Sequence, residues 1–160
     1  MGYLVDKVEW DIKKDMLQKI RERVFVYELH IPKHIEFDSL DKIALHVLVT
    51  DDANCPIATG RLCTDGLIGR IAVLPEHRNR KVYKSLLNFI VELASNQGIE
   101  EVSINCILNE IERFKRNGFI QQGNVFMEAG IPRQRMQCPV SAFKTTPLHT
   151  CSLDKEKGNK

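Results

Sequence analysis

The sequence predicts a single α/β domain with a twisted, mostly antiparallel sheet flanked by helices. Two observations lead to this prediction. The expected elements follow one another as strand, helix, antiparallel meander, crossover helix, strand, short helix and two final strands, an order typical of a mixed sheet. The 160 residues also suffice for one domain with a substantial hydrophobic core.

The N-terminal part is predicted to form an edge strand over residues 3–8 and then a long helix. Asp11 is a suitable helix cap, and the helix should end near His30 because Pro32 cannot continue it. Residues 31–41 are expected to form a loop. The apolar face of the helix is predicted to consist of Ile12, Met16, Ile20, Val24 and Tyr27.

Three strands are predicted next, at residues 43–50, 57–63 and 67–74. The turn chemistry of residues 51–54 and of Asp65–Gly66 joins them as a meander. Since the third strand is followed by Pro75, it should end there.

The crossover helix is predicted from Val82, Leu86, Ile90 and Leu93, which recur at helical spacing, and Gly98 should stop it. A further strand with alternating apolar residues covers 102–106. Asn109 is expected to cap a short helix that ends at Gly118, before strands at 119–127 and 135–139. We expect residues 1–144 to form the domain and the polar residues 145–160 to form a disordered tail.

Composition excludes several classes of protein. The net charge of +2 does not suggest a specific nucleic-acid binder, and no apolar run reaches the length of a membrane span. No signal-peptide pattern opens the chain, and the five cysteines form neither a zinc pattern nor a disulfide framework. We therefore expect a cytoplasmic or nuclear protein without a metal.

A basic turn, residues 77–81, lies where the strand ending at Leu74 passes into the crossover helix. The first amides of a helix have no partners within it and carry the positive end of its dipole, so they bind phosphate groups well. Because three cations in the turn strengthen this potential, the turn is a candidate site for a phosphorylated cofactor.

The same turn resembles the cofactor loop of the GNAT acetyltransferase superfamily, whose pattern is Arg/Gln-x-x-Gly-x-Gly/Ala. The first position is matched by Arg78, but Lys81 and Tyr83 stand at the two small positions, and the Tyr83 ring is placed to occupy cofactor space. The resemblance implies acetyl-CoA as cofactor. It implies cofactor contacts for Val73, Arg78, Asn79, Arg80, Lys81, Val82, Tyr83 and Phe114.

Motifs along nearly the whole chain, to about residue 139, are similar to those of the ElaA-like branch of this superfamily. The resemblance implies a GNAT acyl-CoA N-acyltransferase-like domain. The motifs are Arg23–Val26 with Glu28, residues 36–41, His46, residues 59–62, residues 68–73, Asn117–Phe119, Phe126, Gly130–Pro132 and Met136.

The resemblance also suggests catalytic roles and shows departures from the family pattern. Backbone amides near Val73 would polarise the thioester carbonyl. Glu28 and His46 would lie on the acceptor side, where Glu28 would take the proton of the amine, with a structural polar contact as the alternative for both. The family's frequent tyrosine acid is replaced by Phe114, and the histidine of its Gly-Ile-Pro-His motif is replaced by Arg133.

Several polar residues have structural interpretations as well. Arg61 and Arg70, on adjacent strands, are predicted to pair with the acids of residues 36–41, although the same acids also hint at a cationic acceptor. Cys106 is predicted to be a buried, inert thiol near the acyl site.

Two functions are therefore open. The first is an acetyl-CoA-dependent N-acetyltransferase acting on a small-molecule or peptide amine by direct attack. The second is a degenerate, inactive GNAT-fold protein that serves as a binding or scaffold subunit. The exposed edge of the last strands is a candidate surface for a homodimer or a protein partner.

Overall fold

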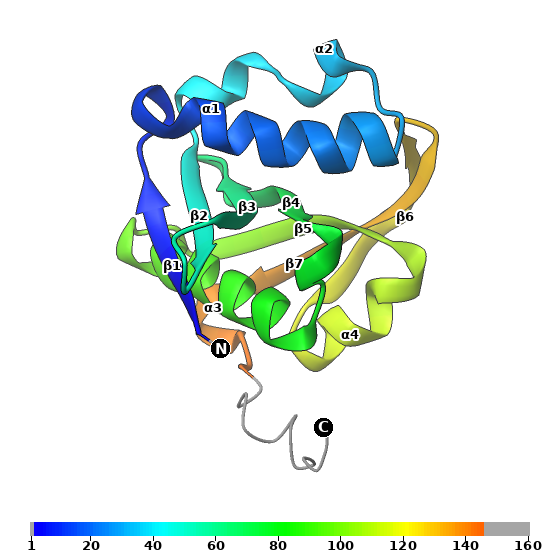
Figure 1. Cartoon of the computed structure of the whole chain (residues 1–160). Coiled ribbons are helices and arrows are strands. Elements are labelled where there is room, and N and C mark those ends of the chain that lie inside the picture. Colours follow the sequence, from blue (N-terminus) through cyan, green and yellow to red (C-terminus); the bar gives the residue numbers. More distant parts are fainter. Residues whose placement is uncertain (1, 146–160) are drawn as a thin grey trace.

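A computed structural model describes residues 2–145 as a seven-stranded mixed sheet with helices on both faces (Figure 1). The strand order is β1-β2-β3-β4-β5-β7-β6, and every neighbouring pair is antiparallel except β4–β5. The predicted α/β fold is therefore confirmed, while all but one residue of the predicted tail lie outside the described part of the chain. The strands are β1 (Tyr3–Val8), β2 (Leu45–Asp51), β3 (Pro56–Leu62), β4 (Leu67–Val73), β5 (Glu101–Ile107), β6 (Ile120–Glu128) and β7 (Ile131–Pro139).

Helices cover the two faces unequally (Figure 1). Helix α1 lies on one face with the short helices that follow it, and α3 and α4 lie on the other. No helix within residues 2–145 is long and apolar enough to cross a membrane. The helical segments are α1 (Trp10–Arg21), the π-helix η1 (Glu22–Glu28), α2 (Lys33–Glu36), η2 (Ser39–Lys42), η3 (Pro75–His77), α3 (Arg80–Asn96), η4 (Leu108–Glu110), α4 (Ile111–Arg116) and η5 (Val140–Ala142).

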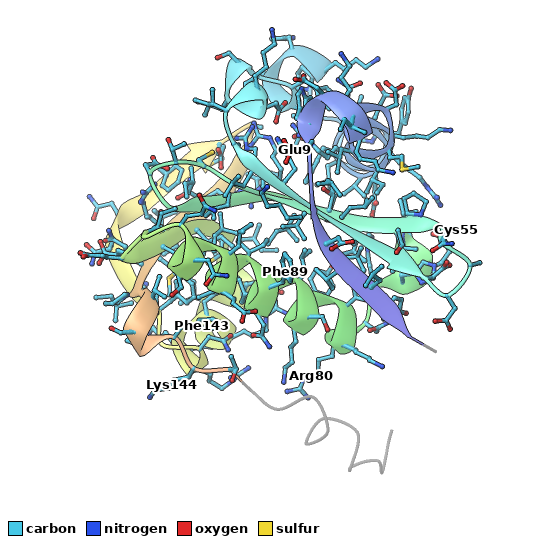
Figure 2. All side chains as sticks on the ribbon, turned by 90° about the vertical axis from the view of Figure 1, so that its left-hand side faces the viewer. Glu9, Cys55, Arg80, Phe89, Phe143 and Lys144 are labelled. Carbon is cyan, nitrogen blue, oxygen red and sulfur yellow. The ribbon has the colours of Figure 1, made fainter. Side chains whose placement is uncertain are left out.

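Side chains fill the space on both faces of the sheet (Figure 2). The larger core lies under α3 and α4, and it contains the predicted helical stripe of Val82, Leu86, Ile90 and Leu93. α3 packs so closely on β3 that a Cβ at Gly60 would meet the Ile90 side chain at 2.7 Å. The smaller core lies under α1 and consists of Leu17, Ile20, Val24, Leu48 and Ala72.

The apolar face predicted for the first helix is wrong at three of its five positions. Ile12, Met16 and Tyr27 are exposed, and the buried positions of α1 are Leu17, Ile20 and Arg21. Asp11 is not the cap either: it lies in the first turn, and the cap residue is Glu9, whose side chain makes no capping hydrogen bond. The end of the helix is close to the prediction, because η1 stops at Glu28 and the backbone turns at a φ of 59° two residues later.

Two further local predictions need correction. Residues 31–41 are not an open loop, since α2 and part of η2 lie there. Asn109 does not cap the short helix, because it lies within η4 and α4 begins after Glu110. The glycine signals hold: Gly98 and Gly118 follow the ends of α3 and α4 at φ values of 78° and 102°.

A bulge and an opening in the middle of the sheet position the site described below. The pairing of β3 with β4 shifts between Thr59 and Arg61, and Arg70 opposite this shift has a φ of 51°. Its guanidinium is fixed by donation to the backbone oxygens of residues 35 and 36 and to Asp38. β4 and β5 pair only at Leu67–Ser103 and Ile68–Ile104, so the two parallel strands separate beyond that point.

Candidate active site

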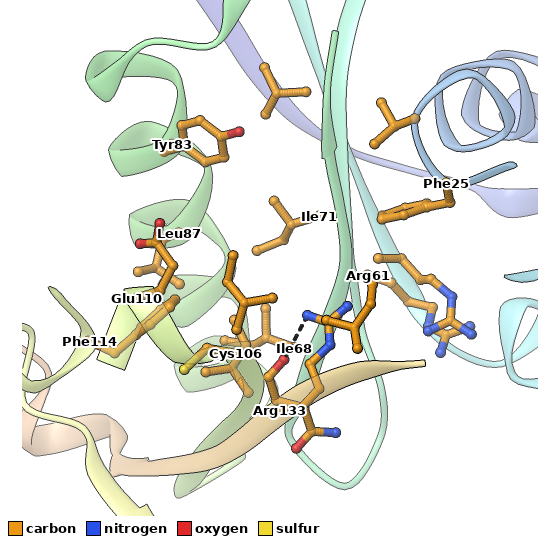
Figure 3. Close-up of a pocket in the computed structure, with 18 of the residues that line it drawn as sticks. Phe25, Arg61, Ile68, Ile71, Tyr83, Leu87, Cys106, Glu110, Phe114 and Arg133 are labelled. Atoms are coloured by element: carbon orange, nitrogen blue, oxygen red, sulfur yellow. Dashed lines mark hydrogen bonds between the residues drawn. The ribbon is translucent and has the colours of Figure 1, made fainter. Parts of the chain in front are cut away.

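A cleft of about 970 Å³ occupies the opening between β4 and β5. It reaches both faces of the sheet, with η1 and α2 on one side and α3 and α4 on the other. Figure 3 shows Phe25 on the η1 side of the strands and Tyr83, Leu87 and Phe114 on the α3–α4 side. A volume near 1,000 Å³ lies at the upper end of the range for small-molecule sites, so the cleft can take a large ligand.

Five of the eight residues that were predicted to contact the cofactor line this cleft: Val73, Arg78, Arg80, Tyr83 and Phe114. The remaining three, Asn79, Lys81 and Val82, are not among its lining residues, and the Val82 side chain is buried in the core. The Asn79 side chain caps α3 by accepting a hydrogen bond from the Val82 amide at 3.0 Å. That amide is therefore occupied in this structure.

Arg78 joins the cofactor loop to η1. Its Nη atoms donate to both carboxylate oxygens of Glu28, at 2.7 and 2.5 Å, and its Nε donates to the Val73 carbonyl oxygen at 2.9 Å. The hydrogen bond from Arg78 holds the pKa of Glu28 below its usual range. Glu28, predicted as an acceptor-side base, is thus a carboxylate engaged by the predicted cofactor residue.

A second ion pair connects the same two segments. Arg23 in η1 donates to Glu76 in η3 at 3.1 Å. The Arg23 side chain is 50% exposed and the Glu76 side chain 56%. Exposed pairs contribute little to stability. The Arg23–Glu76 pair therefore adds little to the position of η1 over the loop.

The Val73 amide points into the cleft. The next amide, that of Leu74, donates to the Ile57 carbonyl oxygen of β3 at 2.9 Å. Because successive amides of a strand point to opposite sides, the Val73 N–H is directed away from β3, toward the separated β5. This gives the cleft a backbone donor beside the start of α3.

Arg113 lies beside the rings of Tyr83 and Phe114, with its guanidinium carbon 5.6 Å from each ring centroid. Glu110 holds this guanidinium by an ion pair of 2.7 Å. In Figure 3 the Tyr83 ring points from α3 toward β4, on the same side as Ile71. Tyr83 therefore narrows the cleft where the family pattern has a small residue.

His46 lies outside the cleft. It is buried on the α1 face, stacks on Trp10 with ring centroids 4.7 Å apart, and Nε2 donates to the backbone oxygen of Asp41 at 2.8 Å. Since a carbonyl oxygen can only accept, this contact assigns the ring proton to Nε2. Burial lowers the pKa of His46, so the ring is neutral at pH 7. This geometry favours the structural alternative for His46.

The acids of residues 36–41 are not free to attract a cationic acceptor, because arginines pair with them. The predicted pairing with Arg61 and Arg70 is present. Arg61 forms ion pairs with Asp38 at 2.7 Å and with Asp41 at 3.0 Å. Arg70 forms an ion pair with Asp38 at 3.0 Å. Burial works to raise the pKa of Asp38, but the hydrogen bond and charge of Arg61 hold it below the usual range.

Arg21 is the member of this cluster that the sequence did not reveal. It is fully buried in α1 and binds Glu36 at 2.7 Å and Asp41 at 2.8 Å. Burial raises the pKa of Glu36 in spite of these contacts. The only sequence signal was its position one turn after Leu17, on a helix whose buried face was assigned to other residues.

Cys106 lines the cleft from β5 and is buried. Burial raises the pKa of its thiol, which therefore stays protonated near neutral pH. This agrees with the predicted inert thiol.

A mixed sheet opened between its two parallel strands, with a helix beginning beside the opening, is the acyl-CoA N-acyltransferase fold. Residues 13–140 match the family model of the acetyltransferase (GNAT) domain, and the chain therefore belongs to the GNAT acetyltransferase family.

Individual relatives agree with this assignment. The uncharacterized N-acetyltransferase YjcF of Bacillus subtilis (strain 168) is 29% identical over 121 residues, which are 73% of this chain and 86% of that protein. Escherichia coli ElaA has a TM-score of 0.73 at 21% identity, over 86% of this chain and 99% of that one. An acyl-CoA N-acyltransferase from Pseudomonas aeruginosa has a TM-score of 0.74 at 22% identity, over 86% of this chain and 98% of that one.

Proposed function

We propose that the protein is an acetyl-CoA-dependent N-acetyltransferase that acts on an amine by direct attack. The observation that supports this best is the cleft between β4 and β5, with the Val73 amide directed into it beside the start of α3. Family membership adds a general acyl-transfer role.

The lining residues fit an anionic cofactor. Eight arginines and lysines line the cleft against four acids. Of these cations, Arg80 and Lys84 lie at the N-terminal end of α3, an arrangement that suits a pyrophosphate. When bound, the cofactor supplies an acetyl thioester, which the amine converts to an amide with release of the thiol.

Within this proposal, the chain contributes positioning and a backbone donor. The Val73 amide would stabilise negative charge that develops on the carbonyl oxygen. Phe114 has no proton to give, so no side-chain acid is assigned at that position, and the amine proton leaves through water. Glu28 would act by holding Arg78 in place rather than as a base.

The alternative function, an inactive binding or scaffold subunit, is favoured by two features. The Tyr83 ring enters the cleft from α3, and the only loop arginine that matches the family pattern is occupied by Glu28. A ligand other than acetyl-CoA would then use the cleft.

Isothermal titration with acetyl-CoA, with CoA alone for comparison, separates the two functions. Micromolar binding of both, followed by thiol release from acetyl-CoA in the presence of amines, is the result expected for the enzyme. Absence of binding at millimolar acetyl-CoA would overturn the proposal and favour the scaffold.

A further inference from the structure

Resting on the proposed function, we infer that the acceptor is an α-amino acid with an apolar side chain, whose carboxylate binds Arg133 and whose amine binds Asn105. Both residues line the cleft. They belong to neighbouring strands, β7 and β5, in which Ile107 pairs with Arg133 and Asn105 with Arg135.

Arg133 and Asn105 lie on the face of the sheet that α1 covers. Ile104 and Cys106 belong to the core under α3, so Asn105 between them points to the opposite face. Met136 belongs to the same core, and Arg133, three residues earlier, therefore also points toward the α1 side. This is the side on which η1 and α2 close the cleft.

Each of these two side chains carries a buried polar atom without a hydrogen-bond partner among the described residues: Nε of Arg133 and Oδ1 of Asn105. The Arg133 guanidinium is nevertheless oriented, because Nη1 donates to the Asn105 backbone oxygen at 3.3 Å (Figure 3). Glu128 forms an ion pair with Nε at 3.7 Å, which is too long for a hydrogen bond, and the Glu128 side chain is half exposed.

The unpaired atoms specify the chemistry of their ligand. A guanidinium N–H calls for an anionic acceptor such as a carboxylate, and an amide oxygen calls for an N–H donor such as an amine. Buried polar groups in proteins normally have partners, so an unpaired donor and an unpaired acceptor on neighbouring strands of one cleft indicate a ligand that carries both complementary groups. Arg61, buried on the same face, adds a second unpaired Nε to the cleft lining.

The apolar part of the acceptor is assigned from the opposite wall. Phe25, Leu29, Ile31 and Ile35, from η1 and the segment through α2, line the cleft there. An aliphatic side chain would be removed from water by these residues while its amino and carboxylate groups meet the sheet. In the reaction, the amine nitrogen bonds to the acetyl carbon, the C–S bond breaks, and CoA leaves as the thiol with the proton that the amine loses.

The test compares L-leucine with 3-methylbutylamine, which is the same molecule without the carboxylate, and with L-leucinamide. Thiol release from acetyl-CoA is measured with the full-length protein, and rates are corrected for the fraction of free amine. We expect kcat/KM to be at least about tenfold higher for leucine than for either analogue, as befits a hydrogen bond to a charged group.

Arg133→Gln should lower kcat/KM for leucine on the order of tenfold to hundredfold, mainly through KM, with a much smaller loss for 3-methylbutylamine. Arg135→Gln is the matched control: Arg135 lies two residues away, donates to the Ser103 hydroxyl at 3.0 Å, and does not line the cleft. This variant should behave as the wild type.

Failure of the inference and failure of the proposed function give different results. Equal rates for leucine and 3-methylbutylamine would overturn the inference and leave the acetyltransferase function intact. If acetyl-CoA does not bind and no amine releases thiol, the proposed function fails. Calorimetric titration with leucine and with the amine then still decides the inference, which predicts binding of leucine alone and its loss in Arg133→Gln.

Discussion

Tyr83 is a half-buried ring in the first turns of α3, where the family pattern has glycine or alanine. If the ring occupies cofactor space, Tyr83→Ala should raise the affinity for acetyl-CoA about tenfold, because relief of an overpacked contact of about 1.4 kcal/mol corresponds to that factor. Isothermal titration measures the change directly. Alanine is preferred to glycine here because it spares the helix a loss of about 1 kcal/mol.

Tyr83→Phe is the control for this variant, since it retains the ring and removes only the hydroxyl. The phenylalanine variant should bind acetyl-CoA as the wild type does. Equal affinities in all three proteins would show that the ring does not obstruct the cofactor.

Glu28 is held by Arg78, and this contact limits what its carboxylate can do. Because its pKa lies below the ordinary value, Glu28 stays ionised throughout the range from about pH 6 to 9, and its titration cannot shape the rate there. We expect Glu28→Gln to keep any inflection of kcat between these limits. We also expect kcat to fall by less than about tenfold, whereas loss of a general base costs on the order of 10²–10⁴. A pH–rate profile of both proteins tests this.

Glu76→Gln provides the comparison for Glu28→Gln, because Glu76 forms the other ion pair between η1 and the loop and is exposed. Both variants should show similar profiles. A fall in kcat of about a hundredfold in Glu28→Gln alone, with disappearance of an inflection that the wild type shows between about pH 6 and 9, would restore Glu28 as the base.

At the level of elements, the strands and the crossover helix could be predicted because their signals are local. The alternation of apolar and polar residues predicted β5, and the apolar residues at helical spacing from Val82 to Leu93 predicted α3. The face of α1 could not be found in this way. Leu17, Ile20 and Val24 have helical spacing, but so do Ile12, Met16 and Ile20, and a buried arginine does not add to an apolar pattern.

The π-helix η1 is a further reason why the buried face of the first helix could not be predicted. The Leu29 amide donates to the Val24 oxygen five residues earlier, so the turn is wider than in an α-helix and the side chains that follow are rotated. Tyr27 lies within this wider turn and is exposed, although α-helical spacing predicted it to be buried.

The separation of β4 from β5 is defined by which residues of two segments far apart in the sequence pair with each other, and local sequence patterns do not show this. The motif located the loop at Arg78, and the structure adds that Glu28, 50 positions earlier in the chain, meets it. Arg133 and Asn105 illustrate the same limit: their unpaired atoms become visible only when β5 and β7 are placed side by side.

Over the whole molecule, the buried ionic cluster links α1, the α2–η2 segment, β3 and β4. Three arginines, Arg21, Arg61 and Arg70, balance Glu36, Asp38 and Asp41. The Arg21 guanidinium also lies 4.8 Å from the centroid of the Phe37 ring. Removal of one member of such a cluster leaves buried charge without a partner, which costs far more than the loss of an exposed pair.

Arg21→Ala should therefore lower the free energy of unfolding by about 3–5 kcal/mol, measured by urea denaturation with circular dichroism. Arg23→Ala, two residues along the same helical segment, removes an arginine of equal size whose ion pair with Glu76 is exposed, and should cost at most about 1 kcal/mol. If the two variants were equally stable, the cluster would not hold α1 on the sheet, and the fixed position of η1 over the cleft would have to come from the apolar contacts of Leu17, Ile20 and Val24 alone.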